Sequence, residues 1–337
     1  MYNISNTDLG EILEYMSMQI NRYFSIFIFL FGTIGNILNC VVLSQPTLRV
    51  NPCAYLFLIS SIANMISILF GLTTRILAGW NIDITDTNSL VCKFRAFIVF
   101  VSRTIAFWLI AFATIDRWFS SCSQYQRRQM SSLKNAQRGT IIIIILSILL
   151  YCQMIYCYEA NMSSTPLPCY GKNVVCRFLT DLTYAIITIL CPLLIMFIFG
   201  LITISNIRQT CTARLFKKKL IVLNGNNKNV LISKKSQQQR KKRIDRYLRH
   251  VLFIQIIFLS ILTIPQAIEK FYTTLSVNAT KSLLNITINK FIYNFVLLLT
   301  YLASGLPFYI YTLSGGSTFR VTLINSLQSI LEKLTCR

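Results

Sequence analysis

Few residues in this 337-residue chain could do chemistry, and those few are charges beside or inside apolar segments. Asp116 and Arg117 are adjacent at the end of one apolar run, Arg103 lies inside that run, and His250 is the single histidine. An adjacent acid and base can form an ion pair that exchanges partners, which makes a two-state element. Acid–base catalysis needs closely placed His, Asp or Glu groups, and the apolar segments offer no such pair. We therefore expect no enzyme, no cofactor and no metal site.

The composition places these charges in a membrane protein. Hydrophobic residues make up 54% of the chain and charged residues 13%, whereas soluble domains have about 25% charged residues. Lys and Arg outnumber Asp and Glu by 33 to 11, which gives a formal net charge of +22. A nucleic-acid-binding protein could carry that charge, but not on so apolar a chain, and no nucleic-acid partner is expected.

Seven apolar runs must position the charged residues. Each is long enough to cross a bilayer as a helix, which takes about 20 residues. The predicted spans are 21–44, 53–77, 91–119, 138–158, 180–206, 248–273 and 289–313. The runs do not alternate in polarity, as spanning strands would. The sequence predicts an all-α membrane protein, with an N-terminus at 1–20, a seven-transmembrane helix bundle at 21–313 and a terminal segment at 314–337.

Basic residues and glycosylation sequons fall on opposite sides of these spans. Alternate loops, counted from the one after the first span, together with the tail, hold 23 of the 33 Lys and Arg residues but 3 of the 11 acids. The positive-inside rule then places the N-terminus outside and the C-terminus in the cytoplasm of a multi-pass plasma-membrane protein. Four sequons lie on the predicted outer segments, so the N-glycosylation candidates are Asn3, Asn161, Asn278 and Asn285.

Two segments on the predicted inner side are suited to the membrane surface. The basic loop 207–247 should attract anionic inner-leaflet lipid, at about 1 kcal/mol per charge. In 314–337, apolar residues recur every three or four positions, at Phe319, Leu323, Leu327, Ile330 and Leu334. This stripe predicts an amphipathic eighth helix on the cytoplasmic surface. Cys336, beside the stripe, is a palmitoylation candidate.

The spacing along the third span is the most specific feature. Arg117, in Asp116-Arg117-Trp118, follows Cys92 by 25 residues, or about 37 Å of helix, which is one membrane thickness plus an interface. One helix would thus hold a cysteine at its outer end and an acid–base pair at its inner end. This resembles the third helix of rhodopsin-like (class A) G-protein-coupled receptors, with its outer cysteine and its Asp-Arg-Tyr motif.

Other positions extend the resemblance over nearly the whole chain. Asn36 and Asn64 look like the polar core residues of the first two helices, although the family usually has Asp at the position of Asn64. The remaining matches are the proline kinks and the seventh-helix tyrosine: Pro192, Pro265, Pro307 and Tyr311. The sixth span lacks the usual Trp, and Pro307 comes one position early. Asn51-Pro52-Cys53 and the Phe-Tyr-Ile-Tyr ending look most like divergent invertebrate receptors near those for FMRFamide-like neuropeptides.

The resemblance assigns roles at both ends of the bundle. At the inner end, Asp116, Arg117 and Tyr311 would control coupling to a heterotrimeric G protein, and arrestin is a further partner. At the outer end, Cys92 would form a disulfide with the second outer loop. Cys169 is the first choice of partner, and Cys176, near the start of the fifth helix, is the second.

The expected ligand pocket surrounds Arg103. It lies 11 residues below Cys92, or about 16 Å along the helix, and an intramembrane charge usually faces the bundle interior. We expect it to pair with an anionic ligand group or with Glu269, or else to form an internal structural salt bridge. The other pocket candidates are Val99, Gln266, Arg75 and Tyr301.

The ligand class can be narrowed by resemblance. Val99 replaces the Asp of amine receptors, and the seventh span has no Lys to hold retinal, so both ligands are disfavoured. Eight of the 11 acids lie on the outer side, which would suit a basic neuropeptide. A non-peptide small molecule is the alternative ligand. The alternative function is a small transporter or channel, which predicts several charges lining a path, whereas Arg103 is the single midspan charge found.

Overall fold

The fold is known from a computed structural model of the chain. It describes residues 6–122, 124–162, 165–221, 232–276 and 282–314, together with 320, 321, 323–325, 328 and 332. Within these ranges the side chains of 6–8, 47, 207–250, 283 and 314 are left undescribed.

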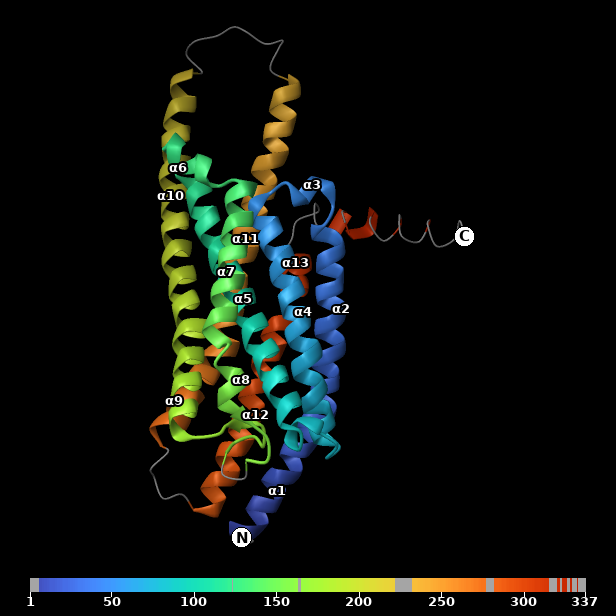
Figure 1. The fold of residues 1–337 in the computed structure, drawn as a ribbon. Helices are drawn as coiled ribbons and strands as arrows, with labels where there is room; N and C mark the ends of the chain where they lie inside the picture. The colour runs from blue at the N-terminus through green and yellow to red at the C-terminus, as the bar shows by residue number, and fades with distance from the viewer. Residues whose placement is uncertain are drawn as a thin grey trace, which may run out of the picture.

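Helices make up almost all of the described chain, so the prediction of an all-α membrane protein with a seven-helix bundle is confirmed (Figure 1). The first half contains α1 (Asn6–Gln19), the π-helical η1 (Ile20–Phe24), α2 (Ser25–Leu43), α3 (Pro46–Arg49), α4 (Pro52–Gly79), the 3-10 turn η2 (Ile84–Asp86), α5 (Ser89–Ser121), α6 (Tyr125–Met130), α7 (Leu133–Tyr151) and α8 (Met154–Cys157). The second half contains the strands β1 (Tyr158–Glu159) and β2 (Tyr170–Gly171), then α9 (Val174–Thr183), the π-helical η3 (Tyr184–Leu190), α10 (Cys191–Ile221), α11 (Ile232–Leu275), α12 (Leu283–Gly305) and α13 (Pro307–Ser314).

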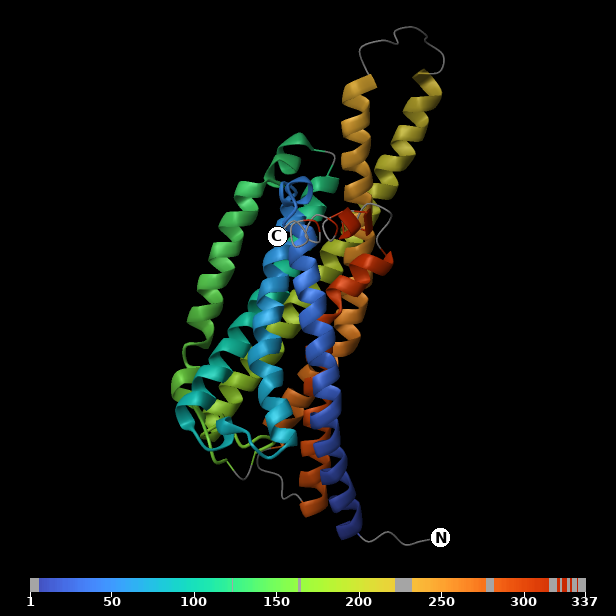
Figure 2. The same ribbon diagram turned by 90° about the vertical axis from the view of Figure 1, so that its right-hand side faces the viewer.

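Seven stretches of the described chain are long and apolar enough to cross a membrane. They are Leu9–Leu43, Pro52–Gly79, Ser89–Ser121, Leu133–Cys157, Val174–Asn206, Val251–Leu275 and Leu284–Gly305. The helices run side by side along one direction (Figures 1 and 2). We call the end that holds Cys92 the disulfide end, and the opposite end the Arg117 end.

Helix bounds differ from the predicted spans where polar residues favour helix. The first helix begins at Asn6 rather than near residue 21, and α1 continues through η1 into α2. Most of the predicted loop 207–247 is helical, because α10 runs to Ile221 and α11 begins at Ile232. Lys, Arg and Gln are good helix formers, so low hydropathy alone does not end a helix. These extensions carry α10 and α11 beyond the other helices at the Arg117 end (Figure 1).

The three kink prolines have different surroundings. Pro192 directly follows the π-helical segment η3 and the first residue of α10. Proline has no N–H to donate to the preceding turn, and the Ile187 carbonyl there accepts a hydrogen bond from the Trp108 indole of α5 at 3.0 Å. Pro265 lies inside the unbroken α11, whereas Pro307 begins α13 after α12 has ended at Gly305.

Two glycines let α2 and α12 approach closely. A Cβ atom on Gly305 would lie 2.8 Å from the Cα atom of Gly32, which is closer than real side chains come. Small residues at helix contacts in a membrane allow close backbone packing. Asn36, one turn beyond Gly32, donates to the carbonyl oxygens of Gly32 at 2.8 Å and of Ser304 at 3.1 Å. The first span is thus joined to the end of α12 in the seventh span.

The predicted eighth helix is described only in part. The described residues 320, 321, 323–325, 328 and 332 are helical. Arg320 donates to the carbonyl oxygens of Thr312 at 2.9 Å and of Leu313 at 3.4 Å, which connects this helix to the end of α13. Four stripe residues and the palmitoylation candidate lie outside the described residues: Phe319, Leu327, Ile330, Leu334 and Cys336.

Candidate functional site

A short β-hairpin covers the disulfide end. Its strands β1 and β2 are antiparallel, and Tyr158 pairs with Gly171. Cys169, next to β2, is bonded to Cys92 at the start of α5, the first of the two expected pairings. A second disulfide, not expected from the sequence, joins Cys157 to Cys176 and so fastens the hairpin to α9. Two covalent bonds thus hold the hairpin over the bundle.

Beneath the hairpin lies a small cavity that is partly open to its surroundings. Its lining comes from α5, the hairpin, η3, α11 and α12. The lining residues are Arg95, Ala96, Val99, Phe100, Arg103, Tyr158, Leu167, Cys169, Tyr170, Tyr184, Gln266, Lys270, Tyr293, Leu297 and Tyr301. Aromatic rings form much of the wall, and a few polar groups converge on the space, as in small-molecule sites.

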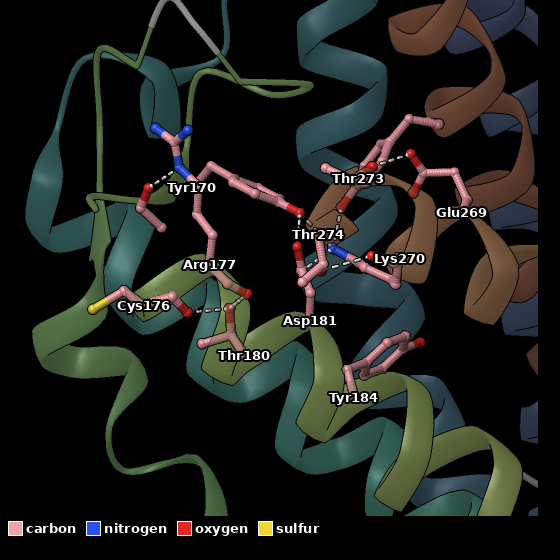
Figure 3. A network of polar contacts seen from close by, with 12 residues as sticks. Tyr170, Cys176, Arg177, Thr180, Asp181, Tyr184, Glu269, Lys270, Thr273 and Thr274 are labelled. Atoms are coloured by element: carbon pink, nitrogen blue, oxygen red, sulfur yellow. Dashed lines mark hydrogen bonds and ion pairs between the residues drawn. The ribbon is translucent and has the colours of Figure 1, made fainter. Parts of the chain in front are cut away.

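A buried ion pair stands at one side of the cavity (Figure 3). Lys270 of α11 lies 2.7 Å from a carboxylate oxygen of Asp181 on α9, and both side chains are almost completely buried. The Lys270 ammonium also donates to the hydroxyl oxygens of Tyr170 at 2.9 Å and Tyr293 at 2.8 Å. These four residues, the Lys270 network, join the hairpin to three helices. A buried pair is stabilising only when further hydrogen bonds satisfy its charges, as they do here.

Tyr170 is the central hydrogen-bonding group of the Lys270 network. Its hydroxyl donates to the second oxygen of Asp181 at 2.7 Å while it accepts from Lys270. Burial, helped by the charge of Asp181, raises the pKa of the Tyr170 hydroxyl well above its usual value. Tyr170 therefore keeps its proton at any physiological pH, and the network does not titrate through this group.

Arg103 lies on the other side of the cavity and is held by neutral groups. Its guanidinium donates to the Ser67 hydroxyl at 3.2 Å and to the Tyr184 hydroxyl at 3.0 Å. The guanidinium carbon also lies 3.9 Å from the centre of the Tyr301 ring, a cation–π contact. The expected partner Glu269 is not among these contacts and instead accepts a hydrogen bond from Thr273 at 2.6 Å. Glu269 and Lys270 are successive helix residues, so their side chains point in different directions (Figure 3).

At the Arg117 end, the adjacent acid and base do form an ion pair. Arg117 lies 2.7 Å from a carboxylate oxygen of Asp116, and both side chains are buried. Arg117 also donates to the side-chain oxygen of Asn51 at 3.1 Å, and that oxygen caps the start of α4 by accepting from the Cys53 N–H. The base thus connects α5 to the N-terminus of α4.

A small, mostly apolar pocket lies beside Arg117. Its lining residues are Thr114, Arg117, Gly200, Thr203, Ile204, Leu252, Phe253 and Ile256, from α5, α10 and α11. Tyr311 of α13 lies at the same end and donates to the side-chain oxygen of Gln255 on α11 at 3.1 Å. Its ring packs against Phe57 of α4.

The chain matches the model of a known protein family over most of its length. The family model described as 7 transmembrane receptor (rhodopsin family) matches residues 35–311. The chain belongs to this family. Rhodopsin-family receptors are membrane proteins with an extracellular ligand and a G-protein partner, and they are not enzymes. The family therefore supports a multi-pass plasma-membrane receptor over a transporter or channel.

A comparison with individual proteins finds a receptor of the same kind. The chain is 25% identical over 142 residues to the Neuromedin U receptor homolog nmur-2 of Caenorhabditis elegans. The match covers 42% of this chain and 35% of that protein. The chain thus matches only about a third of its relative's length, which supports the family without fixing the ligand.

Four of the six expected pocket residues of this receptor line the cavity. They are Arg103, Val99, Gln266 and Tyr301. Arg75 and Glu269 are buried nearby but are not lining residues. Arg75 instead forms an ion pair with Asp83, at 3.6 Å, just beyond the end of α4. A charge near the disulfide end of a span can thus hold a loop in place through an ion pair.

The Lys270 network was not predicted from the sequence. Lys270 is the next residue after Glu269, and Asp181 was counted only as an acid of the outer surface. A signal was nevertheless present in the sixth span. Its polar residues Thr263, Gln266, Lys270 and Thr274 recur every three or four positions, and all four are buried. A polar stripe at helical spacing in a span marks the face toward the bundle interior.

The remaining expected sites are placed as follows. Asn64 is buried in α4. Of the four sequon asparagines, Asn161 and Asn285 are exposed at the disulfide end, and Asn161 has a positive φ of 61° in the hairpin loop. Asn tolerates this left-handed conformation better than most residues. Asn3 and Asn278 lie outside the described residues.

Proposed function

We propose that this receptor binds a peptide ligand in the cavity at the disulfide end and activates a heterotrimeric G protein at the Arg117 end. The observation that carries the proposal is that two helices, α5 and α11, each line both sites, and α5 places Arg103 at the cavity and Arg117 at the other end. The Caenorhabditis elegans relative is a neuromedin U receptor homolog by name, and this favours a peptide ligand over a non-peptide small molecule.

The proposed orientation puts the disulfide end outside the cell. The two described sequon asparagines and both disulfides lie there, and disulfides form in oxidising compartments. The basic segments of the sequence lie toward the other end, as the positive-inside rule requires. Glycosidase treatment should change the electrophoretic mobility of the receptor. A smaller change in Asn161→Gln or Asn285→Gln would support this orientation. Cleavage of the hairpin by a protease added only to the cytoplasmic side would contradict it.

In the proposed mechanism, Arg117 is the moving group. In the structure it is held by Asp116 and Asn51, beside an apolar pocket between α10 and α11. When α10 and α11 separate, that pocket would widen, and Arg117 could leave Asp116 and contact an inserted segment of the G protein. Exchange of one buried partner for another needs a bias of a few kcal/mol, which ligand binding can supply.

The test is agonist-driven nucleotide exchange on purified G protein. Pools of short synthetic peptides, made in free-acid and amidated forms, are applied to receptor in membrane vesicles. We expect one or more pools to stimulate exchange and Arg117→Ala to abolish the response while surface expression persists. Arg128→Ala, on the exposed surface of α6, is the matched control and should retain it. Unchanged coupling in Arg117→Ala would contradict the assignment.

Two further features belong to the same cytoplasmic proposal. The basic segment 207–247 would approach anionic inner-leaflet lipid and could contact the G protein or arrestin. Palmitoylation of Cys336 would hold the tail at the membrane. Sedimentation with vesicles containing phosphatidylserine, compared with neutral vesicles, measures the lipid attraction in a soluble peptide of residues 207–247.

A further inference from the structure

The charge of the cavity wall is one-sided. Among the described lining residues, three are cations, Arg95, Arg103 and Lys270, and none is a carboxylate. Asp181 neutralises Lys270 from behind the wall. Two positive charges then remain without a carboxylate in the lining, in a site that also excludes much of the solvent. A cationic ligand group would meet repulsion here, whatever the acids on the outer surface attract.

Arg103 is the deeper of these two charges. Its side chain is 3% exposed, and its described contacts are two hydroxyl groups and an aromatic ring. One of its terminal nitrogens, Nη2, has no hydrogen-bond partner. Burial of a charge without an opposite charge is costly, and an unmade hydrogen bond adds to that cost.

Gln266 is a further unsatisfied group in the same lining, which also contains the unpartnered Nε of Arg95. Its side chain is completely buried, and neither its amide nitrogen nor its amide oxygen has a hydrogen-bond partner. A free amide of this kind can donate to one oxygen and accept from one N–H group. Buried polar groups are normally paired in proteins, so three lining side chains with unsatisfied atoms are suited to hydrogen-bond a polar ligand.

Resting on the proposed function, we infer that the ligand inserts a carboxylate against Arg103, with a neighbouring amide group hydrogen-bonded to Gln266. A free C-terminus or an acidic side chain of a peptide has this chemistry, and so does a small acylated amino acid. The rings of Phe100, Tyr158 and Tyr184 in the same lining suit an aromatic group of the ligand. A terminal carboxamide could make similar hydrogen bonds, but it would leave the charge of Arg103 uncompensated.

The experiment uses a matched pair of probes that differ in one group. N-acetylphenylalanine carries a carboxylate, an amide and an aromatic ring, whereas N-acetylphenylalaninamide replaces the carboxylate with a carboxamide. Thermal unfolding of the purified full-length receptor in detergent is followed over a concentration series of each probe. We expect the carboxylate probe to raise the Tm by about 3 °C near saturation and the carboxamide to raise it far less.

Variants locate the effect. Arg103→Gln should weaken the apparent affinity for the carboxylate probe at least about tenfold, which is the size of a charge-assisted hydrogen bond. Arg103→Lys keeps the charge and should retain part of the response. It provides a second test in case Arg103→Gln folds poorly. Gln266→Leu should weaken binding of the carboxylate probe to a smaller extent. Lys93→Gln removes a charge from the same helix outside the cavity lining, and it should leave binding unchanged.

Each outcome bears on the inference separately from signalling. Equal stabilisation by both probes, stabilisation by neither, or an unchanged response in both Arg103 variants would overturn it. Nucleotide exchange on a G protein is measured in parallel with free-acid and amidated peptide pools. A retained thermal shift without any exchange would contradict the proposed signalling function while supporting the carboxylate site. Exchange driven only by amidated pools would support signalling and contradict the inference.

Discussion

The disulfide end and the Arg117 end of the bundle are held together by different kinds of contact. At the disulfide end, two disulfides and the ion pair Lys270–Asp181 join different elements of the fold, and the ion pair Arg75–Asp83 holds the loop after α4 against that helix. At the Arg117 end, the ion pair among the described side chains is between neighbours in one helix, Asp116 and Arg117. Apolar packing, the hydrogen bond from Arg117 to Asn51 and neutral hydrogen bonds such as Tyr311 to Gln255 connect the helices there.

This difference indicates where the molecule can change shape. Disulfides and paired charges are directional and fix one arrangement, whereas apolar side chains can repack against a neighbouring helix at lower cost. The disulfide end is therefore suited to hold a cavity of constant shape, and the Arg117 end to open between α10 and α11. The following substitutions compare the two ends, beginning with the largest expected effect.

Removal of the Cys92–Cys169 disulfide should have the largest effect. This bond closes a loop with a sequence separation of 77 residues, against 19 for Cys157–Cys176. In the chain-entropy model these bonds stabilise by about 4.5 and about 3 kcal/mol. Replacement of both cysteines of a pair by Ser should therefore lower surface expression and the Tm more for Cys92/Cys169. Equal losses would mean that the membrane spans already restrict the longer loop.

Removal of one charge from the Lys270 network should come next. Lys270→Met leaves Asp181 buried without its partner, at a cost of at least about 3 kcal/mol, measured as thermal unfolding in detergent. The double variant Lys270→Met with Asp181→Leu should recover most of this loss, because no buried charge remains. A matched lysine, Lys93→Met, lies half-buried on α5 and should change stability by less than about 0.5 kcal/mol. A double variant no better than the single one would show that the pair itself is needed for folding.

Replacement of glycine by alanine should change stability differently at the two ends, because their packing differs. A Cβ atom on Gly71, near the disulfide end, would overlap the ring of Tyr301, whereas one on Gly200, beside the Arg117 pocket, would meet Ile256 at 3.7 Å. Gly71→Ala should destabilise by about 1–3 kcal/mol through overpacking. Gly200→Ala should be neutral or stabilising by up to about 1 kcal/mol, because Ala favours helix. Similar Tm values for the two variants would mean that the packing of the ends does not differ.

Two tyrosine hydroxyls give the smallest comparison. Tyr293→Phe removes an acceptor of the charged Lys270, and Tyr311→Phe removes a neutral hydrogen bond to Gln255. We expect losses of about 2 and about 1 kcal/mol, since hydrogen bonds to charged groups are the stronger. Chemical unfolding monitored by intrinsic fluorescence measures both. The reverse order would contradict the contrast between the ends.

The seven spans could be predicted because apolar length is a local property of the sequence. The bilayer requires about 20 apolar residues in each helix, and no tertiary contact is needed to find them. The ends of helices were less predictable, as α1 and the extensions of α10 and α11 show, because polar residues continue a helix as readily as they end it.

Only those cavity residues could be predicted whose position follows from a single helix. Arg103, Val99, Gln266 and Tyr301 follow from position along a span, and all four line the space. The pairing of Lys270 with Asp181 could not be predicted, because 89 residues separate them and each lies near the end of a predicted span, where charges are usually solvated. The Cys157–Cys176 bond depends on the hairpin, which consists of two strands of two residues each and has no sequence signal of its own.

The unbroken first helix has a practical consequence for optical measurements. From Leu9 to Leu43 it covers 35 residues, or about 52 Å at 1.5 Å per residue, which exceeds the ~30 Å hydrocarbon layer. Arg22 anchors it by donating to the carbonyl oxygen of Gly79 while lying over the Trp80 ring. A fluorophore attached near Leu9 would therefore be held on a continuous helix instead of a flexible segment. Energy transfer from that label to a second one on α11 would report helix displacement as a distance, with little blurring from motion of the dye.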